Sequence, residues 1–178
     1  MQTGRLIAFC VVILLASATR FLTVPQAARA SALPPVVLSA DAIHPRPIEQ
    51  RTGEAITHDY AQAWQDLADA LATNQVDLLN NYFTGEAKRH LTERITAQQR
   101  AGVRTQSIDA GHKVRAVFYS PDGGEMQLED QAKVETKVFD GSRQIYSANS
   151  AQKYLVLMTP GADRWYVRSL ESVPDDAF

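Results

Sequence analysis

The chain has 178 residues, of which 45% are hydrophobic and 21% charged, a composition typical of one globular domain with a single core. Its formal net charge of -2, without a dense run of Lys and Arg, argues against a nucleic-acid partner. The only cysteine, Cys10, can form neither an internal disulfide nor a thiolate cluster. The histidines His44, His58, His90 and His112 lack the paired spacing of metal sites, so we expect no metal and no other cofactor.

The N-terminus has the pattern of an export signal. A positively charged start, MQTGR, precedes the apolar run LIAFCVVILLASA, in which residues 16–18 have the small-x-small form of a cleavage site. The run is shorter than the roughly 20 residues that span a bilayer, but it can extend to Val24 if Arg20 snorkels to the interface. We therefore expect residues 1–24 to be a cleaved signal peptide or an uncleaved membrane anchor. Both place the protein outside the cytoplasm, in the periplasm or cell envelope, held in the inner membrane through residues 6–24 if these are retained.

Residues 25–55 form a proline-containing segment. Five of the eight prolines of the chain fall here, and they oppose both a helix and a central strand. We interpret the segment as an extended, mobile tether. Its stretch VVLSADAI could alternatively add a short edge strand or dock on the domain.

The folded domain, residues 56–175, is predicted to begin with three helices. Residues 57–73, THDYAQAWQDLADALAT, show a helical apolar stripe. That stripe consists of Tyr60, Trp64, Leu67 and Leu71. A short second helix is expected over VDLLNNYF, residues 76–83, and a third over residues 85–101, ended by Gly102.

From Val103 onward the apolar period changes to two. Turn signals at residues 122–124, 140–142 and 159–163 divide the remainder into long strands, which predicts an antiparallel meander with one buried face. If that face is continuous, even-numbered residues of the first two strands oppose one another across a loop of odd length. This register places Phe118 opposite Leu128 and Ala116 opposite Asp130.

The stretch DRWYVRSLES, residues 163–172, alternates in the same way. It follows a turn and is long enough to lie beside YLVLM, so we expect it to close the sheet. Large aromatics on a terminal strand, here Trp165 and Tyr166, more often anchor a sheet against helices than bind a ligand.

Three helices followed by a curved meander that ends in a Trp-bearing strand resemble the cone fold of the nuclear transport factor and ketosteroid isomerase superfamily, also called SnoaL-like. The resemblance covers roughly residues 56–173 and rests on HDYAQAWQDLADALA and KYLVLMTPGADRWYVRSLE. It implies an α+β fold with helices packed on a curved antiparallel sheet. A cystatin-like sheet on a single helix is the alternative, but the second and third helices fit it poorly.

The resemblance implies three kinds of function: enzymes with an acid-base pair inside the cone, binders of small ligands, and exported assembly subunits. Asp130 and His112 are the ionisable residues that share the apolar phase of the first two strands, and Tyr60 begins the first helix. Isomerase-like chemistry needs a carboxylate and a Tyr in a dry pocket, so these three are the candidate catalytic residues. Alternatively, Asp130 and His112 are strand-end residues and Tyr60 is part of the apolar stripe. We expect Tyr60, Trp64 and Phe118 to line the pocket.

The leading hypothesis is a non-enzymatic domain of the cell envelope that binds an envelope protein or a small apolar ligand. One alternative is an isomerase-like or dehydratase-like enzyme. The other is a periplasmic assembly subunit of a secretion or division complex. A homodimer through the outer face of the sheet is a further expectation.

Overall fold

The computed structural model describes residues 32–174 except 42, together with 176 and 178. The predicted signal or anchor lies outside the described residues. None of the helices in the described part combines the length and apolar character that crossing a bilayer requires. In chain order, the elements are β1 Val36–Ser39, β2 His44–Pro45, α1 Gln50–Thr73, the 3-10 helix η1 Val76–Asn80, α2 Gly85–Arg100, β3 Val103–Tyr119, β4 Met126–Asp140, β5 Arg143–Pro160 and β6 Trp165–Val173.

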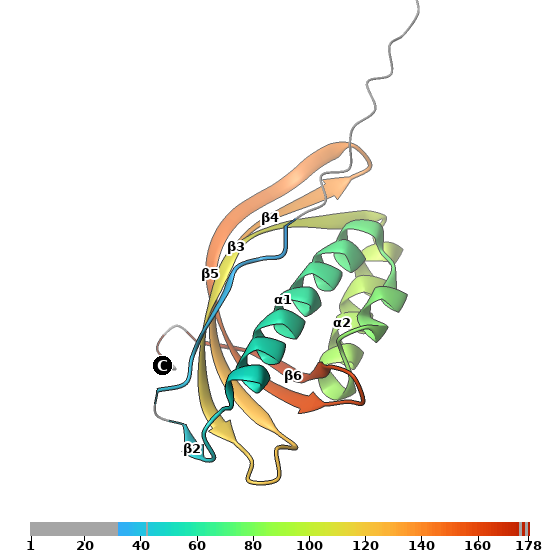
Figure 1. Cartoon of the computed structure of the whole chain (residues 1–178). Coiled ribbons are helices and arrows are strands. Elements are labelled where there is room, and N and C mark those ends of the chain that lie inside the picture. The colour runs from blue at the N-terminus through green and yellow to red at the C-terminus, as the bar shows by residue number, and fades with distance from the viewer. Residues whose placement is uncertain (1–31, 42, 175, 177) are drawn as a thin grey trace, which may run out of the picture. The chain divides into compact units, whose positions relative to one another are not determined.

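A six-stranded sheet forms one layer and the helices form the other. The strand order is β1-β3-β4-β5-β6, and β2 also pairs with β3. Strands β3 to β6 form the predicted antiparallel meander, whereas β1 and β2 run parallel to β3. Figure 1 shows the sheet curving around α1 and α2, which cover its concave face. This architecture is the α+β cone fold that the sequence resemblance implied.

The described residues form two α-helices where three helices were expected. The predicted second helix, residues 76–83, is instead the 3-10 helix η1. Its downstream residues pair with β6: the backbone N–H of Val167 donates to Tyr82 O, and that of Thr84 donates to Val167 O. A segment this short cannot nucleate an α-helix by itself, and pairing with β6 uses backbone groups that a longer helix would need.

The segment interpreted as a tether contributes to the domain over its described residues. Strand β1 pairs with β3 from Val36 opposite His112 to Ser39 opposite Arg115, so the edge-strand alternative is the one observed. Prolines are tolerated just before an edge strand because no partner there needs their missing N–H. Helix α1 also begins earlier than expected, at Gln50 instead of Thr57.

The hairpin between β3 and β4 forms as predicted, but the two strands pair in a different register. From His112 to Ala116, even-numbered residues do oppose one another, yet Ala116 pairs with Leu128 and Val114 with Asp130. A β-bulge between Ala116 and Phe118 inserts one residue into β3, which shifts the register and permits a loop of even length, residues 120–125. The bulge also reverses the phase, so Phe118 is 36% exposed.

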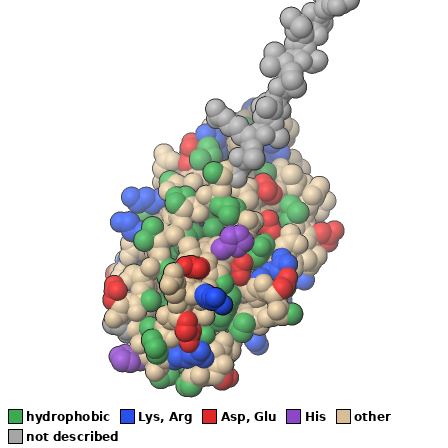
Figure 2. Space-filling view, viewed as in Figure 1, with side chains coloured by type: hydrophobic (Ala, Val, Ile, Leu, Met, Phe, Trp, Pro, Cys, Tyr) green, Lys and Arg blue, Asp and Glu red, His purple; other side chains and the backbone are tan. Residues whose placement is uncertain are grey.

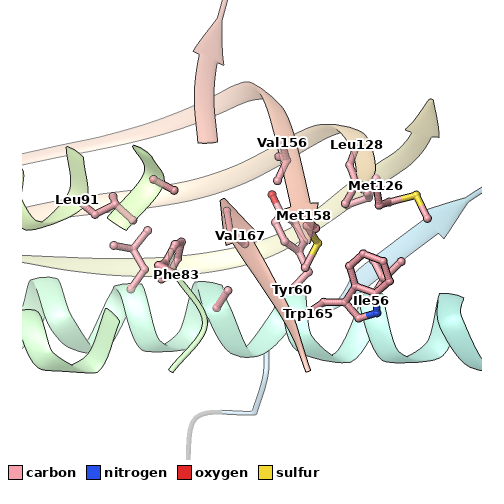
Figure 3. Close-up of a cluster of buried hydrophobic side chains, with 14 of the residues drawn as sticks. Ile56, Tyr60, Phe83, Leu91, Met126, Leu128, Val156, Met158, Trp165 and Val167 are labelled. Carbon is pink, nitrogen blue, oxygen red and sulfur yellow. The ribbon is translucent and has the colours of Figure 1, made fainter. Parts of the chain in front are cut away.

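Strand β6 closes the sheet, as predicted. It pairs with β5 from Val173 opposite Lys153 to Trp165 opposite Pro160. The side chain of Trp165 is 8% exposed and belongs to the core, whereas Tyr166 is only partly buried. Figure 3 shows Trp165 near Ile56 of α1, with apolar side chains of the other strands above them.

Candidate functional site

The three candidate catalytic residues meet inside the cone. Asp130 lies within the first half of β4, with an exposed fraction of 0%. Its Oδ2 accepts hydrogen bonds from the hydroxyl of Tyr60, at 2.8 Å, and from Nδ1 of His112, at 2.7 Å. Figure 3 shows Tyr60 reaching from α1 toward the strands. Asp130 and His112 are therefore not strand-end residues but the polar centre of the domain.

A fourth residue, Asp109, extends this cluster. Its Oδ2 lies 2.7 Å from Nε2 of His112, and its Oδ1 accepts the backbone N–H of Gly111 at 2.7 Å. We call Tyr60, Asp130, His112 and Asp109 the buried polar network. Its most accessible member is Asp109, whose side chain is 14% exposed.

Sequence reasoning missed Asp109 because simple alternation assigns it to the face opposite His112. A β-bulge between Asp109 and Gly111 brings both onto the concave face. Gly111 has a φ of 123°, in the region that favours glycine. The signal that could have found Asp109 was this glycine within a strand pattern, which often marks a bulge.

Helix α1 positions Tyr60 and the aromatic ring that covers His112. Trp64, one turn after Tyr60, stacks over His112 with ring centroids 4.6 Å apart and an interplanar angle of 34°. Asp59, the residue before Tyr60, accepts a hydrogen bond from the backbone N–H of Trp165 through Oδ2 at 2.8 Å. This bond connects α1 to the start of β6. The helix is thus fixed to the sheet on both sides of Tyr60.

Electrostatics favours one protonation state in the network. Burial lowers the pKa of His112, but hydrogen bonds and charge interactions with Asp109 and Asp130 outweigh this and raise it to about 9. Burial, and then the nearby Asp130 carboxylate, raise the pKa of Tyr60 well above its usual value. At neutral pH these pKa shifts favour an imidazolium ion at His112 and a neutral phenol at Tyr60.

Most of the hydrogen-bonding capacity of the network is used internally. As an imidazolium, His112 has no free lone pair, and both of its N–H groups point to carboxylates. The Tyr60 proton is directed at Asp130, so it is not directed at a developing oxyanion. Within the network, one side-chain atom, Oδ1 of Asp130, has no hydrogen-bond partner among the described residues. This atom is buried.

A small cavity lined by both polar and apolar side chains adjoins the network on the side of Asp109. Its volume is about 90 Å³. Its lining includes Trp64, Arg94, Asp109, Gln152 and Tyr154. Binding pockets for organic ligands usually measure about 300–1,000 Å³, so this cavity is too small for a typical substrate.

The predicted pocket-lining residues separate into two groups. Tyr60 and Trp64 lie at the network, and Trp64 also lines the small cavity. Phe118 does not join them: the bulge before it leaves its side chain partly exposed, on a residue that pairs with Gln127 and with His44 of β2. Strict alternation along β3 placed it on the wrong face.

Fold and site together define a cone-fold domain whose apolar core encloses a buried polar network. No family model and no curated protein matches the chain. Among solved structures, the intermembrane space region of chloroplast protein ARC6 matches with a TM-score of 0.62 and 14% identity, covering 74% of this chain and 100% of that one. At that identity, the likeness shows a shared fold.

Two bacterial structures match less well. Kfla4162 from Kribbella flavida has a TM-score of 0.49 and 14% identity, covering 69% of this chain and 93% of that one. ActVI-ORFA from Streptomyces coelicolor has a TM-score of 0.46 and 11% identity, covering 70% of this chain and 98% of that one.

Proposed function

We propose that this chain is a non-enzymatic cone-fold domain of the cell envelope that acts by binding another protein. The observation that carries the proposal is the closed interior of the cone. The side chains of His112 and Asp130 are fully buried and hydrogen-bonded to each other. The cavity beside them, of about 90 Å³, is smaller than the usual binding pocket of an organic ligand, which argues against a small-molecule ligand.

Larger hollows lie at the surface. The groove between β1 and α1 measures about 550 Å³ and combines apolar residues such as Leu38 and Ile48 with the acidic Glu49 and Glu54. Figure 2 shows hydrophobic, acidic and basic side chains interspersed on the face that carries β1 and α1, without one dominant charge. Mixed apolar and polar surface of this kind suits a protein partner better than a nucleic acid.

Two observations support an envelope location. The sequence begins with an apolar run of the kind that directs export. The fold is shared with an intermembrane-space region of a chloroplast protein. An assembly subunit of an envelope complex is the form of the function that these observations favour.

An isomerase-like or dehydratase-like enzyme is the second candidate. It is favoured by the convergence of Tyr60 and His112 on Asp130, since a carboxylate and a phenol are what such chemistry needs. Against it, these groups satisfy one another, and the cavity described beside them measures only about 90 Å³. The two candidates therefore differ in what Tyr60→Phe should change.

In-cell photo-crosslinking of the full-length chain separates them. A photo-reactive residue replaces one side chain at a time: Val37 on β1, Glu54 on α1 or Glu93 on α2. The proposal predicts adducts to one protein from a subset of these positions, unchanged when Tyr60→Phe is added. The enzyme would be favoured instead if no position gave an adduct and a cellular product disappeared in Tyr60→Phe. Fractionation of the same cells tests the envelope location.

A further inference from the structure

The free edge of β5 is the feature from which a further inference follows. β5 comprises Arg143–Pro160, but β6 pairs with it only from Lys153 onward. Among the described residues, no strand lies beside the preceding part of β5 on that edge. Figure 1 shows β4 and β5 extending together well beyond β6.

Within this part, residues 146–152 form a regular edge. They pair one by one with β4, from Tyr146 opposite Val138 to Gln152 opposite Ala132. A register shift just before Tyr146 ends the regular stretch on one side, and the start of β6 ends it on the other. Along this line, alternate residues present unpaired backbone N–H and C=O groups, since the N–H and C=O groups of the residues between them face β4.

The composition of this edge is unusual for an exposed strand. The sequence YSANSAQ, residues 146–152, contains no charged residue, no proline and no glycine. The adjacent strand β4 carries Lys133, Glu135 and Lys137 over the same length, so the lack of charge is specific to the edge. Exposed edges are usually protected by charges, prolines or bulges, because an unprotected edge recruits another strand. Tyr146 at its start is 55% exposed.

We propose that this edge pairs with the same edge of a second copy of the chain, so that two sheets join into one across a two-fold axis. Antiparallel self-pairing of residues 146–152 centres the axis on Asn149. Tyr146 then lies opposite Gln152 of the second copy, and Ala148 lies opposite Ser150. No like charges meet within this stretch or just outside it, where Lys153 lies opposite Ile145 of the second copy. A second copy supplies a strand of matching length and charge, which an arbitrary partner does not.

The dimer differs from one through the outer face of the sheet, because its contacts are main-chain hydrogen bonds at the edge. It also does not depend on the proposed function, since both an enzyme and an interaction domain can dimerise. Roughly one hydrogen bond per residue pair gives about seven bonds, within the range of ordinary protein interfaces. The proposed dimer therefore depends only on the pairing of residues 146–152.

Cysteine cross-linking of the full-length chain in intact cells tests the position of the axis. In a Cys10→Ser background, Asn149→Cys places two thiols across the axis, at a Cα separation of about 4.5–5.5 Å that a disulfide can span. Ser147→Cys is the matched control, because its counterpart in the second copy is four residues out of register, roughly 13 Å away. We expect a disulfide-linked dimer from Asn149→Cys and at least tenfold less from Ser147→Cys. Equal yields, or no dimer from Asn149→Cys, would overturn the proposal.

Charge variants give an independent readout that misfolding cannot imitate. Co-purification of two differently tagged full-length copies measures self-association. Asn149→Lys and Asn149→Glu each place like charges across the axis, so each alone should reduce co-purification about tenfold, and mixing the two should restore it. Gln131→Glu, on the exposed side of the central strand β4, should have no effect. A loss with Gln131→Glu and none with the Asn149 variants would assign the dimer to the outer face and contradict the edge.

Discussion

Asp109 and His112 are three residues apart on β3, yet both side chains lie on the concave face, with Oδ2 of Asp109 2.7 Å from Nε2 of His112. In a regular strand, residues three apart face opposite sides. The bulge at Ala110 changes the phase and so makes this contact possible. The geometry of the polar network thus depends on one backbone irregularity.

The first prediction concerns the glycine that permits the bulge. Gly111 has a φ of 123°, and a Cβ there would lie 2.9 Å from Cγ and 3.0 Å from O of Pro35. Gly111→Ala should therefore lower the free energy of unfolding by about 1–3 kcal/mol or more, measured by urea denaturation. Gly102→Ala is the control: its φ of 69° is also left-handed, but nothing lies within 4 Å, so only about 1 kcal/mol is expected. Equal losses would mean that Pro35, just before β1, does not constrain the residue at position 111.

The second prediction is a pH dependence of stability. The pKa of His112 is raised from 6.5 to about 9 in the folded state, so its contribution is fully present below pH 6.5 and is lost as the pH rises through 9. That difference in pKa corresponds to roughly 3 kcal/mol. Unfolding free energy should therefore decline between about pH 6.5 and 9, and His112→Gln should remove this decline. His90→Gln, on the exposed face of α2, is the control and should retain it. A flat profile in the unsubstituted protein would contradict the imidazolium assignment.

Local periodicity explains why much of the fold was predictable. The apolar stripe of α1 and the alternation of β3 to β6 are repeated along the chain, and burial of one face is enough to produce them. The final strand was placed correctly for the same reason: Trp165 and Val167 share a face and both are buried.

The errors arose where a residue breaks that periodicity or pairs over a long distance. Two bulges in β3 reverse its phase, which concealed Asp109 and misplaced Phe118. The parallel pairing of β1 with β3 joins Val36 to His112, and nothing in the local sequence around Val36 specifies that partner. The candidate site was predictable in its residues Tyr60, His112 and Asp130, but their convergence required the three-dimensional packing of α1 on the sheet.

The third prediction tests the closing strand. The side chain of Trp165 is buried in the core, so Trp165→Ala should lower the free energy of unfolding by about 3–5 kcal/mol. Tyr166→Ala, on the opposite face of β6, should cost clearly less. Chemical denaturation of both variants measures the difference. A melting temperature of Trp165→Ala equal to that of the unsubstituted chain would contradict the role of β6 in the core.

The last prediction concerns how Asp130, His112 and Tyr60 depend on one another. Breaking a buried ion pair leaves its partner without compensation, so Asp130→Asn should lower the free energy of unfolding by about 3–5 kcal/mol at pH 7, whereas a strand-end residue would cost about 1 kcal/mol or less. Because Asp130 and His112 stabilise each other directly, Asp130→Asn combined with His112→Gln should cost less than the sum of the single changes, by about 0.5–3 kcal/mol.

Tyr60→Phe should couple to Asp130→Asn in the same direction, since it removes the other hydrogen bond to Oδ2. His90→Gln should instead be additive with Asp130→Asn within about 0.5 kcal/mol, because His90 is exposed on α2 and bound to Glu86. Additivity throughout the network would show that its members stabilise the fold separately. Coupling confined to Asp130, His112 and Tyr60 would instead show that the polar centre acts as one unit, held together by the packing of α1 on the sheet.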